Sequence, residues 1–344
     1  MKEDFIKELL AHIAAGNNLT KDESYKIFNA ILKGVLTSAQ IASLLTALKI
    51  KGETEDEIAG AALAMSENVE SVNIQNEYKS ILVDTCGTGG DSKNTFNIST
   101  CSALIAAGAG VKIAKHGNYA VSSKSGSADV LKELGVNISL NAEKVIKSIE
   151  YANIGFLFAP NFHKAMKYAA PVRKELGFKT IFNVLGPLTN PLGVKNQIIG
   201  VYSENLSKKI VSVLKILNSG KAFVVHGRDG MDEISLSAMT DIYRLDEFGN
   251  VEYFQFNPEE YGFSFFDEGE FKSFSVASNA KIIYDIISGN KSPRADIAIL
   301  NAGFAILVSG KAADLEDAFI EARRSIESGK ALKALQNLIE ISNE

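Results

Sequence analysis

Cysteine is scarce in this sequence: Cys86 and Cys101 are the only two among its 344 residues. Two cysteines can make neither a disulfide framework nor, by themselves, a four-ligand metal site. This scarcity excludes disulfide-stapled secreted domains and cysteine-based zinc domains. We expect both cysteines to be small buried residues in a reducing cytosol.

An excess of positive charge and long apolar runs are also missing. The formal net charge is −5, so the chain lacks the basic surplus with which a general nucleic-acid binder neutralises phosphates. No run of 18 apolar residues occurs, and CSALIAAGAG at 101–110 is short and broken by glycine, as in a packed helix. The opening MKEDFIKELL carries early acidic residues, unlike a signal peptide. We therefore expect a cytoplasmic protein with no membrane and no nucleic-acid partner.

The sequence has two parts with different hydrophobic patterns. Its length suffices for one large domain or two unequal ones. The first seventy or so residues are helical in pattern, with apolar residues at helical spacing over 5–13 and T-x-x-E capping boxes at Thr20 and Thr54. Beyond them, short β-type runs such as SILVD, VKIA and QIIGVY alternate with helical stretches. This alternation predicts an α/β fold with a mostly parallel sheet flanked by helices. From about Ala280 onward the tail is expected to be helical.

A glycine-rich stretch, DTCGTGGDSKNTFNIST at 84–100, follows the predicted strand SILVD. Ligands of open α/β sheets bind at the carboxyl ends of strands, and glycines let backbone N–H groups converge on an anion. We expect Asn97 to cap the next helix and to leave the N–H groups of Ile98, Ser99 and Thr100 free. A tight turn with an N-cap is the alternative. The stretch lacks the G-K-[ST] of a P-loop, and Ser92 stands where a dinucleotide-binding loop has its third glycine.

A second polar stretch, KHGNYAVSSKSGSADVL at 115–131, follows the predicted strand VKIA. A lone histidine such as His116 is more often structural than catalytic. A basic, hydroxyl-rich loop beside a glycine loop nevertheless favours contact with phosphate or pyrophosphate. We expect one loop to hold Lys115, His116, Asn118, Ser122, Ser123, Lys124 and Ser127.

Two further stretches carry charge where a ligand could use it. Asp232 and Glu233 follow the predicted strand KAFVVHG and are either a solvated turn or ligands for Mg²⁺ together with waters and phosphates. In PVRKELG, Gly177 is expected to end a helix. If Pro171 starts that helix, Arg173 lies in its first turn, against the preference of the helix dipole for anions. Arg173 is then either a surface residue or a guanidinium placed to receive a carboxylate.

The motifs GTGGD, NIST, KHGN, SSKSGSADVL, PVRKELGFKTIFNVLGPLTNP and DGMDEIS, in this order, resemble those of the anthranilate phosphoribosyltransferases over essentially the whole chain. The resemblance implies a helical domain, 1–72, with 160–185 packed back on it, and an α/β domain, 73–344, with the site in the cleft between them. It also implies a homodimer formed through the helical domain. The reaction would transfer the 5-phosphoribosyl group of phosphoribosyl pyrophosphate (PRPP) to the amino group of anthranilate, releasing pyrophosphate, in tryptophan biosynthesis.

The resemblance also assigns residues, with two Mg²⁺ ions per subunit. Anthranilate would be recognised by Gly87, Asn118 and Arg173, and Mg²⁺ by Ser99, Asp232 and Glu233. Lys115 and the metal would stabilise the leaving pyrophosphate, with no nucleophile needed. Tyr119 departs from the arginine usual after KHGN, which would remove a charge-assisted phosphate contact. The implied PRPP-binding residues are Gly87, Gly90, Asp91, Thr95, Asn97, Ile98, Ser99, Thr100, Lys115, His116, Gly117, Asn118, Tyr119, Ala120, Val121, Ser122, Ser123 and Ser127.

Two other functions stay open at this point. A pyrimidine nucleoside phosphorylase shares the fold type and a glycine-rich motif similar to GSADVL, but it would use phosphate and a nucleoside without Mg²⁺. A non-catalytic paralogue that binds phosphoribosyl ligands is the other. The acidic pair and GTGGD favour the transferase.

Overall fold

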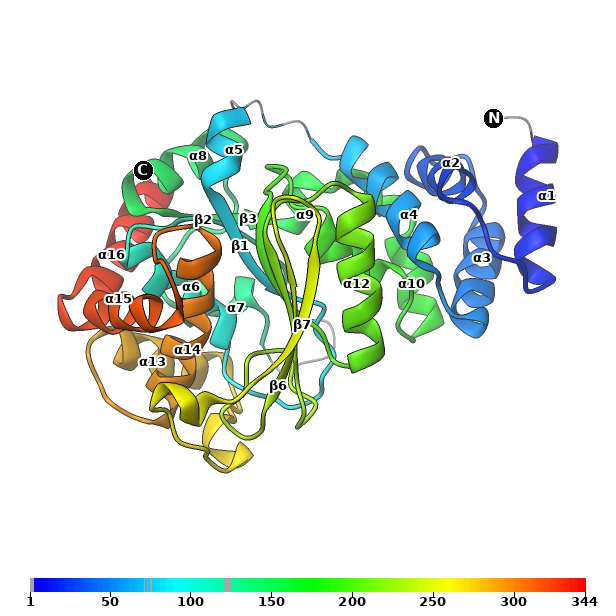
Figure 1. Ribbon diagram of the computed structural model, residues 1–344. Helices are drawn as coiled ribbons and strands as arrows, with labels where there is room; N and C mark the ends of the chain where they lie inside the picture. The colour runs from blue at the N-terminus through cyan, green and yellow to red at the C-terminus, as the bar shows by residue number, and fades with distance from the viewer. Residues whose placement is uncertain (1–2, 71, 73, 75, 121–124) are drawn as a thin grey trace.

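The computed structural model describes residues 3–70, 72, 74, 76–120 and 125–344. Three residues of the implied PRPP set, Val121, Ser122 and Ser123, lie outside the described residues. The chain forms a small bundle of helices at its amino-terminal end and a larger body built on a sheet (Figure 1). Within the described residues, no helix is long and apolar enough to cross a membrane.

The amino-terminal bundle contains α1 (Glu3–Ala14), α2 (Lys21–Leu32), α3 (Ser38–Lys51) and α4 (Glu55–Glu67). The capping boxes predicted at Thr20 and Thr54 are confirmed, each with Glu at the third helical position. A third box at Thr37 caps α3, so Ser38 is its first helical residue. Helices α2 and α4 pack closely because Gly60 has no side chain; a Cβ there would overlap the Lys21 carbonyl oxygen.

The larger body is built on a sheet of seven strands among the described residues, in the order β3-β2-β1-β4-β5-β6-β7. β1 to β5 run parallel and β6 and β7 antiparallel, which confirms the predicted mostly parallel α/β fold. The pair β6–β7 was not foreseen from the sequence. The strands are β1 (Leu82–Gly87), β2 (Lys112–Gly117), β3 (Ile154–Phe158), β4 (Asn196–Gly200), β5 (Ala222–Gly227), β6 (Thr240–Leu245) and β7 (Val251–Phe256).

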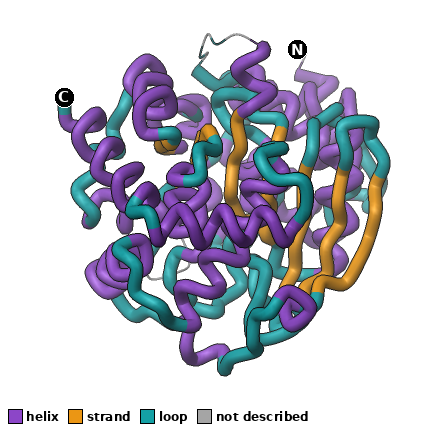
Figure 2. Tube along the Cα trace, turned by 60° about the vertical axis from the view of Figure 1, so that its left-hand side comes forward, coloured by secondary structure: helices purple, strands orange, loops and turns teal. Residues whose placement is uncertain are grey.

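Helices cover the sheet (Figure 2). Ser80 and Ile81, expected in the first strand, instead end α5, so β1 begins at Leu82. α14 is almost entirely buried, as its apolar sequence predicts, and packs against α6 in the main core. The covering helices are α5 (Asn76–Ile81), α6 (Ile98–Gly108), α7 (Ser127–Glu133), α8 (Ala142–Ala152), α12 (Glu204–Ile216), α13 (Val276–Ile287), α14 (Pro293–Val308), α15 (Leu315–Glu327) and α16 (Lys330–Asn343).

Between β3 and β4 the chain makes the short helices α9 (Ala159–Phe162), α10 (Ala170–Leu176) and α11 (Phe182–Leu185). Val172 and Ile181 share one buried cluster with the helices of the amino-terminal bundle, and α10 contacts α3 (Figure 1). This segment therefore joins the core of the bundle. The division of the chain at residue 72 stays a prediction.

Candidate active site

The carboxyl ends of the parallel strands bring the predicted loops together at one edge of the sheet. Gly87 at the end of β1 is paired with Gly200 at the end of β4. A Cβ on Gly87 would lie 2.8 Å from Asp232 Oδ2, and one on Gly200 would overlap the Asp232 backbone. These two glycines therefore make room for the turn that carries the acidic pair. The structure places Gly87 and Asp232 side by side, as the sequence-based site requires.

The glycine loop, residues 88–97, adopts an unusual backbone. Gly89 and Gly90 have φ angles of 65° and 86°, and the non-glycine residues Ser92 and Asn94 have φ of 60° and 55°. Left-handed residues other than glycine cost roughly 1–2 kcal/mol each, so the loop depends on outside support. Part of this support comes from the 268–273 segment. The N–H of Phe96 donates to the Phe271 carbonyl at 2.8 Å, and the Asn94 carbonyl accepts from the N–H of Ser273 at 2.9 Å.

The prediction that three N–H groups at the start of α6 are free is wrong. The N–H of Ile98 donates to the Phe96 carbonyl at 2.7 Å, and that of Thr100 to the Asn97 carbonyl at 3.1 Å. The N–H of Ser99 donates to Glu233 Oε1 at 3.1 Å. The acidic pair thus occupies the helix end where an external anion was expected.

Asn97 does hold the N-cap position of α6, but its side chain makes no capping hydrogen bond. Its Oδ1 accepts from Ser125 Oγ at 3.3 Å, and its N–H donates to Asn279 Oδ1 at 2.7 Å. Asn279 Nδ2 in turn donates to Ser125 Oγ at 2.7 Å. Asn279, 1% exposed, therefore ties the glycine loop to the second loop. No local sequence signal marked it.

Lys115 and His116 belong to strand β2 rather than to the loop in which they were expected. Lys115 is 2% exposed, and its ammonium donates to the Thr85 carbonyl at 2.6 Å and lies 3.4 Å from Ser99 Oγ. Burial lowers its pKa, while the charges of Asp84 and Glu233 oppose that shift. The ammonium thus lies beneath the glycine loop and the acidic pair, in the floor of the site.

Asp84 is a buried carboxylate that holds this floor together. It accepts hydrogen bonds from the His116 N–H at 3.2 Å and from Asn190 Nδ2 at 2.8 Å. Burial raises its pKa, and the neighbouring His116 and Lys115 lower it. Through these bonds Asp84 joins β1, β2 and the turn around residue 190. The thiol of Cys86 has a pKa raised by burial and by Asp84, so it does not supply a reactive thiolate.

A pair of buried histidines was only half anticipated. The rings of His116 and His163 lie 5.1 Å apart, and His116 Nδ1 lies 3.2 Å from the Gly186 carbonyl. The Nε2 atoms of both rings are buried without a hydrogen-bond partner among the described residues. Burial, then the neighbouring His116, lowers the pKa of His163 to about 3, so it is neutral at pH 7. Buried polar atoms are seldom left unpaired, so this histidine pair is an unusual feature of the floor of the site.

Three carboxylates meet beside the glycine loop: those of Asp91, Asp232 and Glu233. Burial raises the pKa of Asp232 well above its usual range, and the charges of Asp91 and Glu233 raise it further. Burial likewise raises the pKa of Glu233 to about 7, although Lys115 opposes the shift. Asp91 Oδ2 is buried with no hydrogen-bond partner among the described residues. Crowding disfavours the charged forms of these carboxyl groups, and a bound cation would stabilise them.

The donor set suits Mg²⁺ only if a ligand completes it. Across the described ranges, no group of three or more His, Cys, Asp or Glu side chains has the spacing to hold a metal ion by itself. Mg²⁺ usually keeps several waters and takes one or two carboxylates plus substrate phosphates. Ser99, Asp232 and Glu233 fit that pattern, and the carboxyl group of Asp91 lies against that of Asp232.

Arg173 does not lie in the first turn of its helix, where the sequence predicted it. Pro171 is the second residue of α10, and Arg173 falls in the last turn of this seven-residue helix, where a cation is favoured. Gly177 ends the helix with φ 67°, as predicted. The Arg173 guanidinium lies 5.3 Å from the Phe182 ring centre, is partly buried with its pKa lowered by that burial, and pairs with none of the described acidic residues. Among the described residues it is therefore a cation without a counter-ion.

The second loop is closed by Asp129, whose Oδ2 accepts from the N–H groups of Ala120 at 3.0 Å and Gly126 at 2.8 Å. Asn118 Oδ1 accepts from the N–H of Tyr119 at 2.8 Å. The Tyr119 ring packs edge-on against Phe158, with centroids 5.0 Å apart, and is 42% exposed.

Two more of the implied residues meet at the end of β2, where a Cβ on Gly117 would overlap Ser127 Oγ. Thr95 forms an isolated bridge with Lys272. What any of these implied residues binds stays a prediction.

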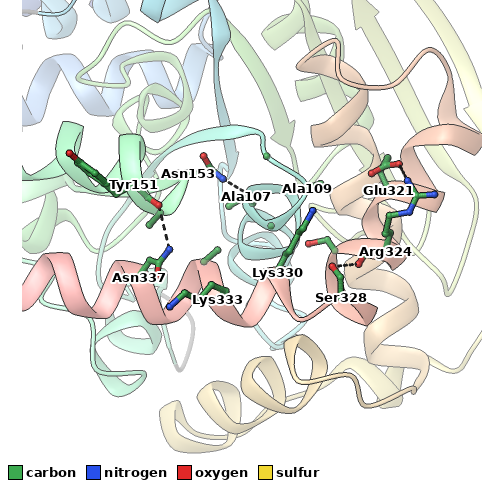
Figure 3. Close-up of a pocket in the computed structure, with 15 residues that line it drawn as sticks. Ala107, Ala109, Tyr151, Asn153, Glu321, Arg324, Ser328, Lys330, Lys333 and Asn337 are labelled. Atoms are coloured by element: carbon green, nitrogen blue, oxygen red, sulfur yellow. Dashed lines mark hydrogen bonds and ion pairs between the residues drawn. The ribbon is translucent and has the colours of Figure 1, made fainter.

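The cavity drawn in Figure 3, of about 320 Å³, lies elsewhere. It opens where α6 and α8 end, just before β2 and β3 begin, and faces α15 and α16. Its lining includes Ala109, Tyr151, Lys330 and Lys333, and none of the residues assigned above. It is thus at the opposite end of the strands from the loops.

Comparison with known proteins gives the family. A family model described as "Glycosyl transferase family, a/b domain" matches residues 79–332, and one described as "Glycosyl transferase family, helical bundle domain" matches 7–69. The anthranilate phosphoribosyltransferase of Methylobacillus flagellatus is 47% identical over 98% of both chains, and that of Aquifex aeolicus 44% identical over 99% of both. The chain belongs to the anthranilate phosphoribosyltransferase family. It is therefore an enzyme of the glycosyltransferase class.

Solved structures of the anthranilate phosphoribosyltransferase family have the same fold. That from Thermus thermophilus has a TM-score of 0.90 at 36% identity, over 97% of this chain and 99% of that one. That from Saccharomyces cerevisiae in complex with PRPP and Mg has a TM-score of 0.90 at 29% identity, over 99% of both chains. A second yeast structure, in complex with 4-fluoroanthranilate, has a TM-score of 0.87 at 27% identity, over 99% of both. The resemblance seen in the sequence is thereby confirmed.

Proposed function

We propose that the enzyme transfers the 5-phosphoribosyl group of PRPP to the amino group of anthranilate, giving N-(5-phosphoribosyl)anthranilate and pyrophosphate, as a step of tryptophan biosynthesis. The observation that carries the proposal is the crowding of Asp91, Asp232 and Glu233 beside a glycine loop with left-handed backbone. Such a site is incomplete without cations and a polyanionic ligand. The yeast relative with PRPP and Mg supports the same ligands here.

The proposed reaction needs no covalent intermediate with the protein. The nitrogen of anthranilate attacks ribose C1 while the bond from C1 to the pyrophosphate oxygen breaks, and pyrophosphate leaves with the electron pair. An aromatic amine is unprotonated at neutral pH, so the proton lost from nitrogen after attack needs no strong base. The protein supplies orientation of the amine and a fixed positive field for the leaving group. Lys115, whose ammonium lies 3.4 Å from Ser99 Oγ, contributes to that field from the floor of the site.

We assign two Mg²⁺ ions per subunit to this edge of the sheet, held by Ser99, Asp232 and Glu233 with phosphate oxygens and water. When bound, Mg²⁺ neutralises the charge of the departing pyrophosphate. The protein itself holds the proposed ligand oxygens in place before the metal binds. The Ser99 N–H, for example, fixes one oxygen of Glu233 at 3.1 Å.

Anthranilate is proposed to bind where its carboxylate meets Arg173, with Asn118 and Gly87 as further contacts. The site then lies in a cleft between a helical domain, 1–72, joined by 160–185, and an α/β domain, 73–344. The two family models, a helical bundle domain over 7–69 and an a/b domain over 79–332, support this division. We place the reaction in the cytoplasm, because a polyanion such as PRPP does not cross a bilayer unaided.

A fluorescence assay tests the function. Anthranilate fluorescence is expected to fall only when enzyme, PRPP and Mg²⁺ are all present, to stop falling when EDTA is added, and to resume with excess Mg²⁺. Phosphorolysis of a pyrimidine nucleoside without Mg²⁺ would instead identify a nucleoside phosphorylase. Binding of PRPP with no loss of either substrate would identify a non-catalytic paralogue.

We also propose a homodimer through the amino-terminal bundle. An apolar groove of about 540 Å³ between α1 and α3 is lined by Ile13, Ala47 and Ile50, and the Ile50 side chain is 82% exposed. Burying such a face against a second copy removes apolar surface from water. Ile50→Asp is expected to shift the protein from dimer to monomer in sedimentation, whereas Ile320→Asp, at an exposed isoleucine on α15, should not. A wild-type monomer at micromolar concentration would contradict the proposal.

A further inference from the structure

Lys179 reaches from the segment of Arg173 to the glycine loop. It lies between α10, which Gly177 ends, and α11, so its backbone is anchored on both sides. Its ammonium donates to the Gly90 carbonyl at 2.7 Å and lies 4.2 Å above the Tyr202 ring. The lysine is only partly buried, so this direct contact with the loop costs little desolvation.

The contact is built into the shape of the loop. A Cβ on Gly90 would overlap the end of the Lys179 side chain, and Gly90 has φ 86°. The left-handed backbone favours glycine at position 90, and the missing side chain leaves room for the end of the lysine. The second half of the loop is held by the 268–273 segment, including the Lys93–Glu268 ion pair at 3.0 Å. Lys179 supplies the corresponding support at residue 90.

Holding the Gly90 carbonyl also sets the next N–H. A peptide bond is planar and trans, so the N–H of Asp91 points opposite to the Gly90 carbonyl and away from Lys179. The N–H groups of Gly90 and Asp91 have no acceptor among the described residues. Successive N–H groups in left-handed turns form concave anion sites. These two donors can replace the three at the start of α6 that proved to be occupied.

We propose that Lys179 is a positioning residue for PRPP: by holding the Gly90 carbonyl, it fixes the Gly90–Asp91 peptide and keeps the Asp91 N–H directed at the pyrophosphate, next to the Gly90 N–H of the preceding peptide. The inference rests on the proposed function for the identity of that ligand. Because Lys179 and Arg173 lie on one short segment, the same element that carries the candidate anthranilate contact also shapes the PRPP loop.

The test compares Lys179→Met with Lys179→Arg. Methionine keeps the aliphatic length and removes the charge and donor, so the PRPP KM is expected to rise about tenfold, as for a lost charge-assisted hydrogen bond. The anthranilate KM and kcat should change less than about threefold. Lys179→Arg should recover most of the PRPP affinity, because a guanidinium can still donate to the carbonyl.

Lys209→Met is the matched control. Lys209 Nζ also donates to a backbone carbonyl, that of Glu53, at 2.6 Å, and it lines the same cavity as Lys179 without bonding to the glycine loop among the described residues. The PRPP KM of this variant should stay at the wild-type value. An equal rise in Lys209→Met, a Lys179→Met variant with unchanged PRPP KM, or no recovery in Lys179→Arg would overturn the inference.

Titration with Mg²⁺-pyrophosphate, followed by calorimetry, separates this inference from the proposed function. Weaker pyrophosphate binding to Lys179→Met than to wild type supports the role of Lys179 even if anthranilate is not the acceptor. Equal binding overturns it even if anthranilate turnover is confirmed.

Discussion

The double variant Asp232→Asn, Glu233→Gln is expected to lose measurable turnover while staying folded. Both carboxylates have a raised pKa in the folded state because of burial and neighbouring negative charge. Because the folded-state pKa of each group lies above its unfolded-state pKa, ionising the group lowers the free energy of unfolding at any pH above the unfolded-state value. Neutral amides of equal size therefore remove an unfavourable charge interaction at pH 7. The glutamine that replaces Glu233 keeps an oxygen that can accept from the Ser99 N–H. The fold should survive, and the loss should be in Mg²⁺-dependent catalysis, measured as kcat with thermal melting alongside.

A second double variant controls for the change in net charge. Glu259→Gln with Glu260→Gln alters an adjacent acidic pair that is exposed in a 3₁₀ turn. It changes the charge by the same amount and should retain wild-type activity. Substantial turnover by Asp232→Asn, Glu233→Gln at ordinary Mg²⁺ would remove both residues from the proposed metal site.

Arg173→Ala is expected to raise the anthranilate KM by roughly ten- to a hundredfold. A partly buried, charge-assisted contact is worth on the order of 1.5–3 kcal/mol, which corresponds to that factor. The contact forms before and during the reaction alike, so kcat should change little. The PRPP KM should also change little, because we propose that the pyrophosphate binds at the glycine loop. Parallel titrations of the two substrates measure the split.

Two companion variants make the result specific to Arg173. Arg173→Lys should recover little, because a lysine cannot offer two parallel donors to one carboxylate. Lys174→Ala removes the exposed neighbouring cation and should behave as wild type. A defect confined to PRPP would refute the assignment, and an unchanged anthranilate KM would make Arg173 an ordinary surface residue packed on Phe182.

Local patterns predicted what local forces determine. The capping boxes at Thr20 and Thr54, the end of α10 at Gly177 and the position of the glycine loop after β1 all follow from short-range signals. The strand–helix alternation predicted the parallel part of the sheet. The β6–β7 pair was missed because no α-helix directly follows either strand, so the strand–helix alternation that marked the other strands is absent.

Contacts between distant residues could not be predicted in this way. The N–H groups at the start of α6 would be free only if no acceptor reached them. The acceptor for the Ser99 N–H is Glu233, which lies 134 residues further along the chain, so a local pattern could not reveal it. Lys179 meets Gly90 across 89 residues, and neither has a motif that names the other. His163 was equally hidden, since an isolated histidine carries no sign of the second ring that it will face.

The hydrogen bond from Asn97 to Asn279 has a consequence for the timing of biosynthesis. The two residues are 182 positions apart, so the ribosome makes the glycine loop long before the side chain that ties it to its neighbour. At typical elongation rates of roughly 5–20 residues per second, the interval is about 10–40 s. During that interval the nascent chain can pair its early parallel strands, but the two loops at their ends have no α13 between them. A ribosome stalled before residue 279 would therefore expose a sheet whose ligand-facing edge is still open.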